Sequence, residues 1–186
     1  MDFLTLLASK SPLLASIGQA KRAADASETM WIGVLADTSG GIHPGVLDLF
    51  DGMDFIVHCG RIGSPDVLNE LSNISPISGV LGMGDAPEDF PFEAVFAKEM
   101  GGVLVMAVHD VGNPNEPRPV IQELVEDREP KVVLFGRPAE AFSATLDDRL
   151  WFGPGSASAS HPSPSVGIVE IDGASLRSEI ILLKDL

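Results

Sequence analysis

Apolar and polar residues follow one another along this chain in a pattern that predicts strands and helices in turn from residue 31 onward. Short apolar runs indicate buried strands, and segments whose apolar residues recur at helical spacing indicate helices. The predicted strands are residues 31–36, 55–58, 77–81, 93–96, 103–108 and 132–135, and the predicted helices are residues 44–50, 66–71 and 119–126. Residues 143–152 predict a hairpin, and residues 166–171 and 176–183 predict two closing antiparallel strands. This order predicts an α/β domain whose first half is a largely parallel sheet.

Residues 1–29 have a different pattern and predict an N-terminal helical extension ahead of a domain that spans residues 30–186. Ser11 and Pro12 are typical of a helix cap and a first helical position, and the apolar residues that follow fall on one helical face. Such a face must be buried somewhere. Three uses stay open: packing on its own domain, association with a protein partner or a second copy through residues 3–24, or a frayed tail.

Charged or titratable side chains stand at the ends of the predicted strands, and they are Asp37, Arg61, Asp85, His109 and Arg137. In α/β sheets, ligands bind outside the carboxyl ends of parallel strands. We therefore expect a functional site where these residues converge.

The composition narrows the classes of function. The chain carries a formal net charge of −15, which repels phosphate backbones and anionic membranes, so nucleic acid is not an expected partner. No apolar run approaches the roughly 18 residues of a membrane span, and the N-terminus lacks the pattern of a signal peptide. Cys59 is the sole cysteine and is expected to be a small buried residue, while His43 and His161 are expected in exposed loops. Together these features predict a cytoplasmic protein.

Six short motifs occur in order along the chain, and they are Asp37-Thr38-Ser39, Gly60-Arg61, Gly82-Met83-Gly84-Asp85, His109, Gly136-Arg137-Pro138-Ala139 and Gly153-Pro154-Gly155-Ser156. This order resembles the calcineurin-like metallophosphoesterases, especially a small single-domain phosphodiesterase branch that includes the retromer scaffold subunit, a protein-binding platform. The resemblance covers about residues 31–183 and implies a two-sheet sandwich flanked by helices. The family motifs read Asp-x-His, Gly-Asp, Gly-Asn-x-Asp, His, Gly-His-x-His and Asn-Pro-Gly-Ser, and they hold two divalent metals that activate water and polarise the phosphate.

Most of the metal ligands that this resemblance implies are replaced. Asp37 and His109 match ligands, whereas the other matching positions hold Ser39, Arg61, Met83, Arg137 and Ala139. A thioether and a methyl group offer little to a hard divalent metal, and a guanidinium stays protonated and repels cations. We therefore expect no cofactor, and a single Mn, Fe or Zn ion on Asp37 and His109 is the alternative.

Arg61 and Arg137 carry the charge that could replace the lost metals. They are expected to pair with Asp37 and Asp85, because an unpaired buried carboxylate costs several kcal/mol. The alternative is that the two arginines, with nearby backbone amides, form a pocket for a small anion.

No catalytic residue is predicted with this set of side chains. The predicted function is a catalytically inactive metallophosphoesterase-like domain that acts as a protein-binding or scaffold module. Two alternatives stay open: a divergent metal-dependent phosphodiesterase or phosphatase with a reduced metal site, and a sensor of a small anionic ligand.

Overall fold

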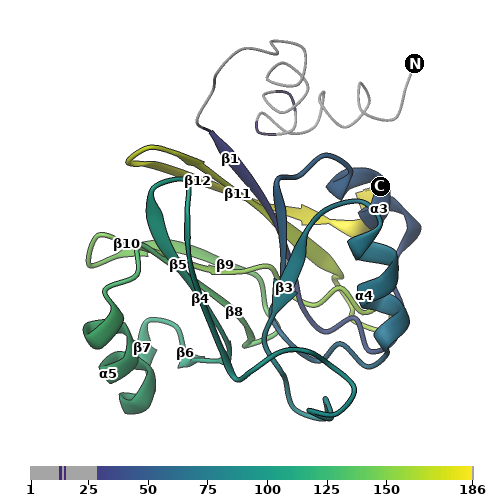
Figure 1. Cartoon of the computed structure of the whole chain (residues 1–186), viewed down its shortest axis with the longest axis horizontal. Coiled ribbons are helices and arrows are strands. Elements are labelled where there is room, and N and C mark those ends of the chain that lie inside the picture. The colour runs from purple at the N-terminus through teal and green to yellow at the C-terminus, as the bar shows by residue number, and fades with distance from the viewer. Residues whose placement is uncertain (1–12, 14, 16–28, 186) are drawn as a thin grey trace.

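The computed structural model describes residues 13, 15 and 29–185, which form two five-stranded sheets packed face to face with helices on their outer sides (Figure 1). The strand order is β12-β11-β1-β2-β3 in the first sheet and β4-β5-β8-β10-β9 in the second. Both sheets contain parallel and antiparallel pairs. The predicted α/β two-sheet sandwich is therefore confirmed.

The first sheet consists of β1 (Met30–Leu35), β2 (Phe55–His58), β3 (Ile77–Gly79), β11 (Ser165–Asp172) and β12 (Ser175–Leu182). The second consists of β4 (Val95–Met100), β5 (Val103–Asp110), β8 (Val132–Arg137), β9 (Phe142–Leu146) and β10 (Arg149–Gly153), and a small ribbon is formed by β6 (Gly112–Asn113) and β7 (Glu116–Pro117). The described helices are α3 (Pro44–Phe50), α4 (Pro65–Ser72), α5 (Pro119–Arg128) and the short 3₁₀ helix η1 (Leu183–Asp185). None of the described helices is long and apolar enough to cross a membrane.

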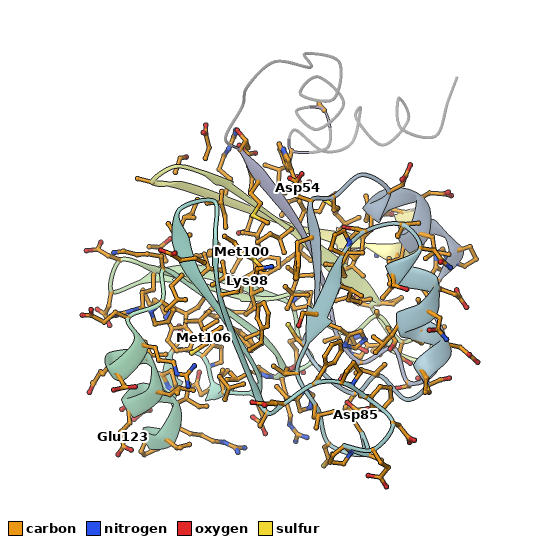
Figure 2. The ribbon with its side chains drawn as sticks, viewed as in Figure 1. Asp54, Asp85, Lys98, Met100, Met106 and Glu123 are labelled. Carbon is orange, nitrogen blue, oxygen red and sulfur yellow. The ribbon has the colours of Figure 1, made fainter. Side chains whose placement is uncertain are left out.

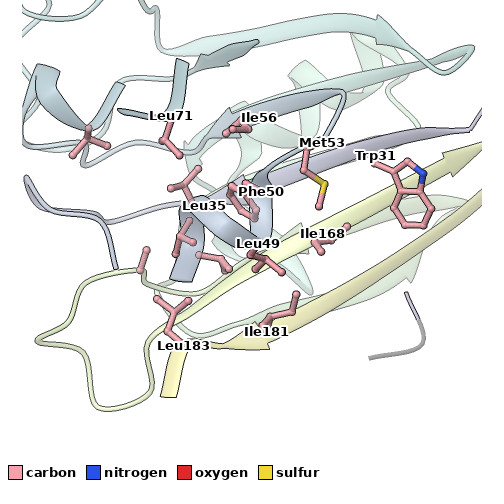
Figure 3. Packing of buried hydrophobic residues seen from close by; sticks show 14 of the residues in the cluster. Trp31, Leu35, Leu49, Phe50, Met53, Ile56, Leu71, Ile168, Ile181 and Leu183 are labelled. Carbon is pink, nitrogen blue, oxygen red and sulfur yellow. The ribbon is translucent and has the colours of Figure 1, made fainter. Parts of the chain in front are cut away.

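The apolar core lies in three layers. Between the first sheet and the helices α3 and α4, the buried side chains include Leu35 and Phe50 (Figure 3). Between the two sheets, Val34 and Val132 belong to a second cluster, and α5 covers the second sheet through side chains such as Val125. β1 is apolar along its whole length because its two faces are covered by different layers.

Leu13 contributes to the first of these layers. Its side chain is 6% exposed and belongs to the same cluster as Trp31 and Phe50. At this residue, therefore, the N-terminal segment packs on its own domain. Apart from Leu13 and Ala15, the predicted partner surface at residues 3–24 lies outside the described residues.

Two strands differ from the sequence prediction. β3 ends at Gly79 rather than at residue 81, and β4 occupies residues 95–100 rather than 93–96. β4 continues through Lys98 because residues 95–100 pair with β5, where Lys98 stands opposite Val105, and the Lys98 ammonium lies 4.5 Å from the centroid of the Phe55 ring. Figure 2 shows Lys98 and Met100 on this strand. Glu93 makes only an isolated bridge with Val80.

The carboxyl ends of β2, β5 and β8 meet at one edge of the sandwich. His109 on β5 donates a hydrogen bond from Nδ1 to the carbonyl oxygen of Cys59, which follows β2, across 2.8 Å. Gly136 on β8 lies so close to this carbonyl that a β-carbon there would come within 2.2 Å of it. The sequence therefore needs glycine at this position for the two sheets to approach one another.

Candidate functional site

The loops that follow β1 and β2 run side by side and form the floor of the site. The amide of Asp37 donates to the Gly60 carbonyl at 3.0 Å, and the amide of Ser39 donates to the Arg61 carbonyl at 3.1 Å. Asp37, Ser39 and Arg61 all have positive φ, at 56°, 52° and 57°. Left-handed backbone at residues other than glycine is uncommon and concentrates at functional sites.

A series of buried hydrogen bonds holds these two loops in place. The Nδ1 atom of His58 accepts from the amide of Gly60 at 3.1 Å, so the ring proton is on Nε2 and is donated to Thr38 Oγ1 at 3.0 Å. Thr38 in turn donates to the carbonyl of Ile62 at 2.8 Å. Burial lowers the pKa of His58 to about 3, so this imidazole is neutral. Its role is to position the loops.

Asp85 is a second loop anchor and forms no arginine pair. Its Oδ1 accepts from the amides of Ile62 at 2.8 Å and Gly63 at 3.2 Å, and its Oδ2 accepts from Gly82 at 2.8 Å. Figure 2 shows Asp85 in the loop between β3 and β4. The prediction that Asp85 pairs with an arginine is wrong among the described residues, because three backbone amides donate to its two oxygens instead.

Arg61 and Asp37 form the ion pair that the sequence predicts. Arg61 Nη1 lies 3.6 Å from Asp37 Oδ2, and the two side chains are 42% and 6% exposed. Burial raises the pKa of Asp37, and the charges of Arg61, His109, His161 and Arg137 oppose that rise. The arginine is too exposed for the pair to be the buried salt-bridge cluster that the sequence suggests.

Arg137 binds a different carboxylate from the predicted ones. Its Nε lies 3.7 Å from Asp110 Oδ2, which also accepts from Arg118 Nη2 at 2.9 Å. Asp110 Oδ1 accepts from the amide of Gly112 at 2.9 Å. Sequence reasoning missed Asp110 and Arg118, although the place of Asp110 directly after His109 at a strand end could have pointed to the aspartate.

Two buried polar atoms at the site, Asp37 Oδ1 and His109 Nε2, have no hydrogen-bond partner within the part of the chain that the structure describes. Asp37 is 5% exposed and His109 is 9% exposed. Because Nδ1 of His109 donates to the carbonyl of Cys59, Nε2 is the ring nitrogen that is left without a partner among the described residues. His161 is half-buried, and its Nδ1 atom lies 3.0 Å from the carbonyl oxygen of Ser163 in the same loop.

The side chains of Ser39, Met83 and Ala139 make no polar contact with the residues that the structure describes. Ser39 is exposed, Met83 is 66% exposed and Ala139 is half-buried. The turn at residues 153–156 is buried, and the carbonyl of Ser156 accepts from the amide of Ser165 at 2.8 Å. This turn shapes the backbone beside β1 and brings no reactive group.

The calcineurin-like phosphoesterase superfamily domain matches residues 30–174. The chain belongs to this superfamily. It is 32% identical over 162 residues to a probable metallophosphoesterase of Methanothermobacter thermautotrophicus, across 82% of this chain and 92% of that protein. A solved archaeal phosphodiesterase matches 82% of this chain and 100% of its own with a TM-score of 0.65 at 19% identity. Vps29 of Entamoeba histolytica, solved in complex with zinc, matches 83% of this chain and 99% of its own, with a TM-score of 0.60 at 15% identity.

Proteins of the calcineurin-like phosphoesterase superfamily normally bind divalent metals, so the donors that the described residues offer decide how many ions could be held here. Among residues 13, 15 and 29–185, no three His, Cys, Asp or Glu side chains are grouped so that they could hold a metal ion. Asp85 is already bound by backbone amides, and Arg61 places a positive charge 3.6 Å from the Asp37 carboxylate. The residues present therefore do not fit a two-metal centre.

Proposed function

We propose that this chain is a catalytically inactive metallophosphoesterase-like domain that acts in the cytoplasm by binding another protein or a second copy of itself. The observation that carries this proposal is the Arg61 guanidinium, 3.6 Å from Asp37 Oδ2. The resemblance implies a metal-ligating carboxylate at residue 61. A fixed cation there repels a divalent ion and takes up the charge of the one acidic ligand that is left.

The rest of the site supports the same proposal. Restoring a metal centre would require changes at several positions, because Ser39, Met83 and Ala139 supply no donor and Arg137 is engaged with Asp110. The two sheets and their helices are nevertheless complete. A domain that keeps its fold but has lost its metal ligands can still act by binding a partner through its surface.

The test is metal content and turnover in the full chain against a variant with restored ligands. The restored variant carries Ser39→His, Arg61→Asp, Met83→Asn, Arg137→His and Ala139→His. After incubation with manganese, elemental analysis should find less than stoichiometric metal in the wild type and bound metal in the variant. The variant should also hydrolyse bis(p-nitrophenyl) phosphate faster than the wild type. Two tightly bound ions and matching turnover in the wild type would overturn the proposal.

A second candidate, a phosphodiesterase with one metal, is favoured by a specific observation. Asp37 Oδ1 and His109 Nε2 are both unpartnered acceptors, which are the atoms that a divalent ion would take. Replacing His109 by Ala should then abolish manganese binding and any turnover together. Wild-type chain that binds no manganese in a calorimetric titration excludes this candidate.

A further inference from the structure

Glu170 is a buried carboxylate on the first sheet, far along β1 from the strand ends that carry the candidate site. On β11 it stands opposite Trp31 of β1 and opposite Arg177 of β12. Its side chain is only 2% exposed. Arg177 donates to Glu170 Oε1, whereas Glu170 Oε2 is buried and has no hydrogen-bond partner among the described residues. Buried polar atoms in native proteins are nearly always hydrogen-bonded, so this oxygen calls for a donor.

The face of the sheet that carries Glu170 is the one on which Leu13 packs. Side chains two residues apart on a strand share a face, and Ile168, two residues before Glu170, belongs to the layer that contains Trp31 and Leu13. Figure 3 shows Trp31 at the end of this layer that is farthest from Leu71. Leu13 therefore brings the N-terminal segment to the face on which a buried carboxylate oxygen lacks a partner.

The charge of the N-terminal segment is complementary to this face. Residues 10–24 contain Lys10, Lys21 and Arg22 and no Asp or Glu, although the whole chain has a net charge of −15. Lysine and arginine side chains combine N–H donors with positive charge, and hydrogen bonds from such donors to a carboxylate are stronger than neutral ones. The segment that contains Leu13 therefore carries the kind of donor that Glu170 lacks.

We propose that the face around Trp31 and Glu170 is the docking surface for residues 10–24 of the same chain, and that one cation of this segment donates to Glu170 Oε2. Leu13 supplies the apolar part of the contact, and the ion pair fixes the position of the segment on the sheet. This inference does not depend on the loss of the metal ligands, because Trp31 and Asp37 stand at opposite ends of β1.

Tryptic cleavage of the full chain tests the docking, because trypsin cuts after lysine and arginine and therefore after Lys21 and Arg22. Cleavage there should require the segment to leave the sheet. Glu170→Gln keeps the shape of the side chain and removes its charge, so it should speed cleavage by about tenfold or more. Glu123→Gln, at an exposed position on α5, is the matched control and should leave the rate unchanged. Equal rates for the wild type and Glu170→Gln would overturn the inference.

Double-mutant cycles identify the donor and still decide if Glu170→Gln fails to fold. One of Lys10→Gln, Lys21→Gln and Arg22→Gln should lower the midpoint of thermal unfolding by about 3 to 10 °C. The same variant should cause little further loss when it is combined with Glu170→Gln, because the two residues share one interaction. Lys131→Gln, at an exposed position, is the control. If all three variants behave like this control, water satisfies Glu170 Oε2 and the inference is wrong.

Protein concentration separates docking within one chain from exchange between copies. The wild-type rate of tryptic cleavage after Lys21 and Arg22 should be the same over a wide range of protein concentration. Protection that increases with concentration would assign the face to the segment of a second copy and would overturn docking within one chain. None of these outcomes alters the metal content of the chain, so the inactive scaffold is tested independently.

Discussion

The carboxylate of Asp85 lies 2.8 Å from the backbone amide of Ile62 and accepts its hydrogen bond. The same carboxylate accepts from the amides of Gly63 and Gly82, so it joins the loops after β2 and β3. Asp85→Ala leaves these donors without a partner and should lower the free energy of unfolding by about 2 to 4 kcal/mol. Urea denaturation measures the loss, and Asp89→Ala at a nearby exposed position is the control.

Arg61 should matter far less for stability than Asp85. Its side chain is 42% exposed and stands 3.6 Å from Asp37, the geometry of a solvent-screened ion pair. Arg61→Gln should therefore cost less than about 1 kcal/mol in urea denaturation. A loss as large as that of Asp85→Ala would show that the pair is effectively buried.

His58 makes the fold sensitive to acid. Its pKa is lowered by burial from 6.5 to about 3, so the folded state stays neutral while the unfolded chain takes up a proton. Neutral His58 makes its full contribution to the free energy of unfolding above about pH 6.5. Below that pH, the contribution falls by about 1.4 kcal/mol per pH unit until about pH 3. Burial raises the pKa of Asp37, so the contribution of this residue to the free energy of unfolding increases as the pH falls.

The contribution of His58 can be isolated by measuring the free energy of unfolding of the wild type and of His58→Gln between about pH 4 and pH 8. Asp37 is present in both chains, so its effect cancels in the difference. The difference between the two chains should shrink as pH falls. His43→Gln, which changes an exposed histidine, should keep the wild-type slope. A constant difference between wild type and His58→Gln would refute the assignment.

Gly136 should tolerate no side chain. Its β-carbon would lie 2.2 Å from the carbonyl oxygen of Cys59, the atom to which His109 donates. Gly136→Ala should lower the midpoint of thermal unfolding and cost about 1 to 3 kcal/mol. Gly41→Ala is the matched control, because a β-carbon there meets nothing within 4 Å.

Leu13 tests what the N-terminal segment does. Because it is 6% exposed in the cluster that contains Phe50, Leu13→Ala should cost about 2 to 4 kcal/mol. Val120→Ala, at a 65% exposed position, should cost little. Sedimentation of the Leu13→Ala chain should show an unchanged association state. A smaller oligomer at unchanged stability would instead place Leu13 in an interface between copies.

Most strands and helices could be predicted from the sequence because buried apolar residues recur at the spacing typical of each element. The strands β1, β2, β5 and β8 and the helices α3, α4 and α5 were predicted close to their observed bounds. The extent of β4 was mispredicted at Lys98, whose ammonium lies over the Phe55 ring. That contact depends on tertiary structure, which hydrophobic pattern alone does not encode.

Only part of the candidate site could be predicted from the sequence. The Arg61–Asp37 pair follows from charge and from strand ends that meet. The pairing of Arg137 with Asp110 does not, because it depends on which of two nearby carboxylates a long side chain reaches. Asp85 was misjudged because its partners are backbone amides, which carry no signal in residue types.

The loops that carry Asp37 and Arg61 are held by hydrogen bonds to each other's main chain. The left-handed residues Asp37, Ser39 and Arg61 lie within this network of main-chain hydrogen bonds. Under the proposed function, this chain should reach its final form regardless of how much manganese, iron or zinc a cell supplies. On the same proposal, starvation for trace elements would leave the fold and the surface of this protein unchanged, whereas a metal-dependent phosphoesterase would lose its activity.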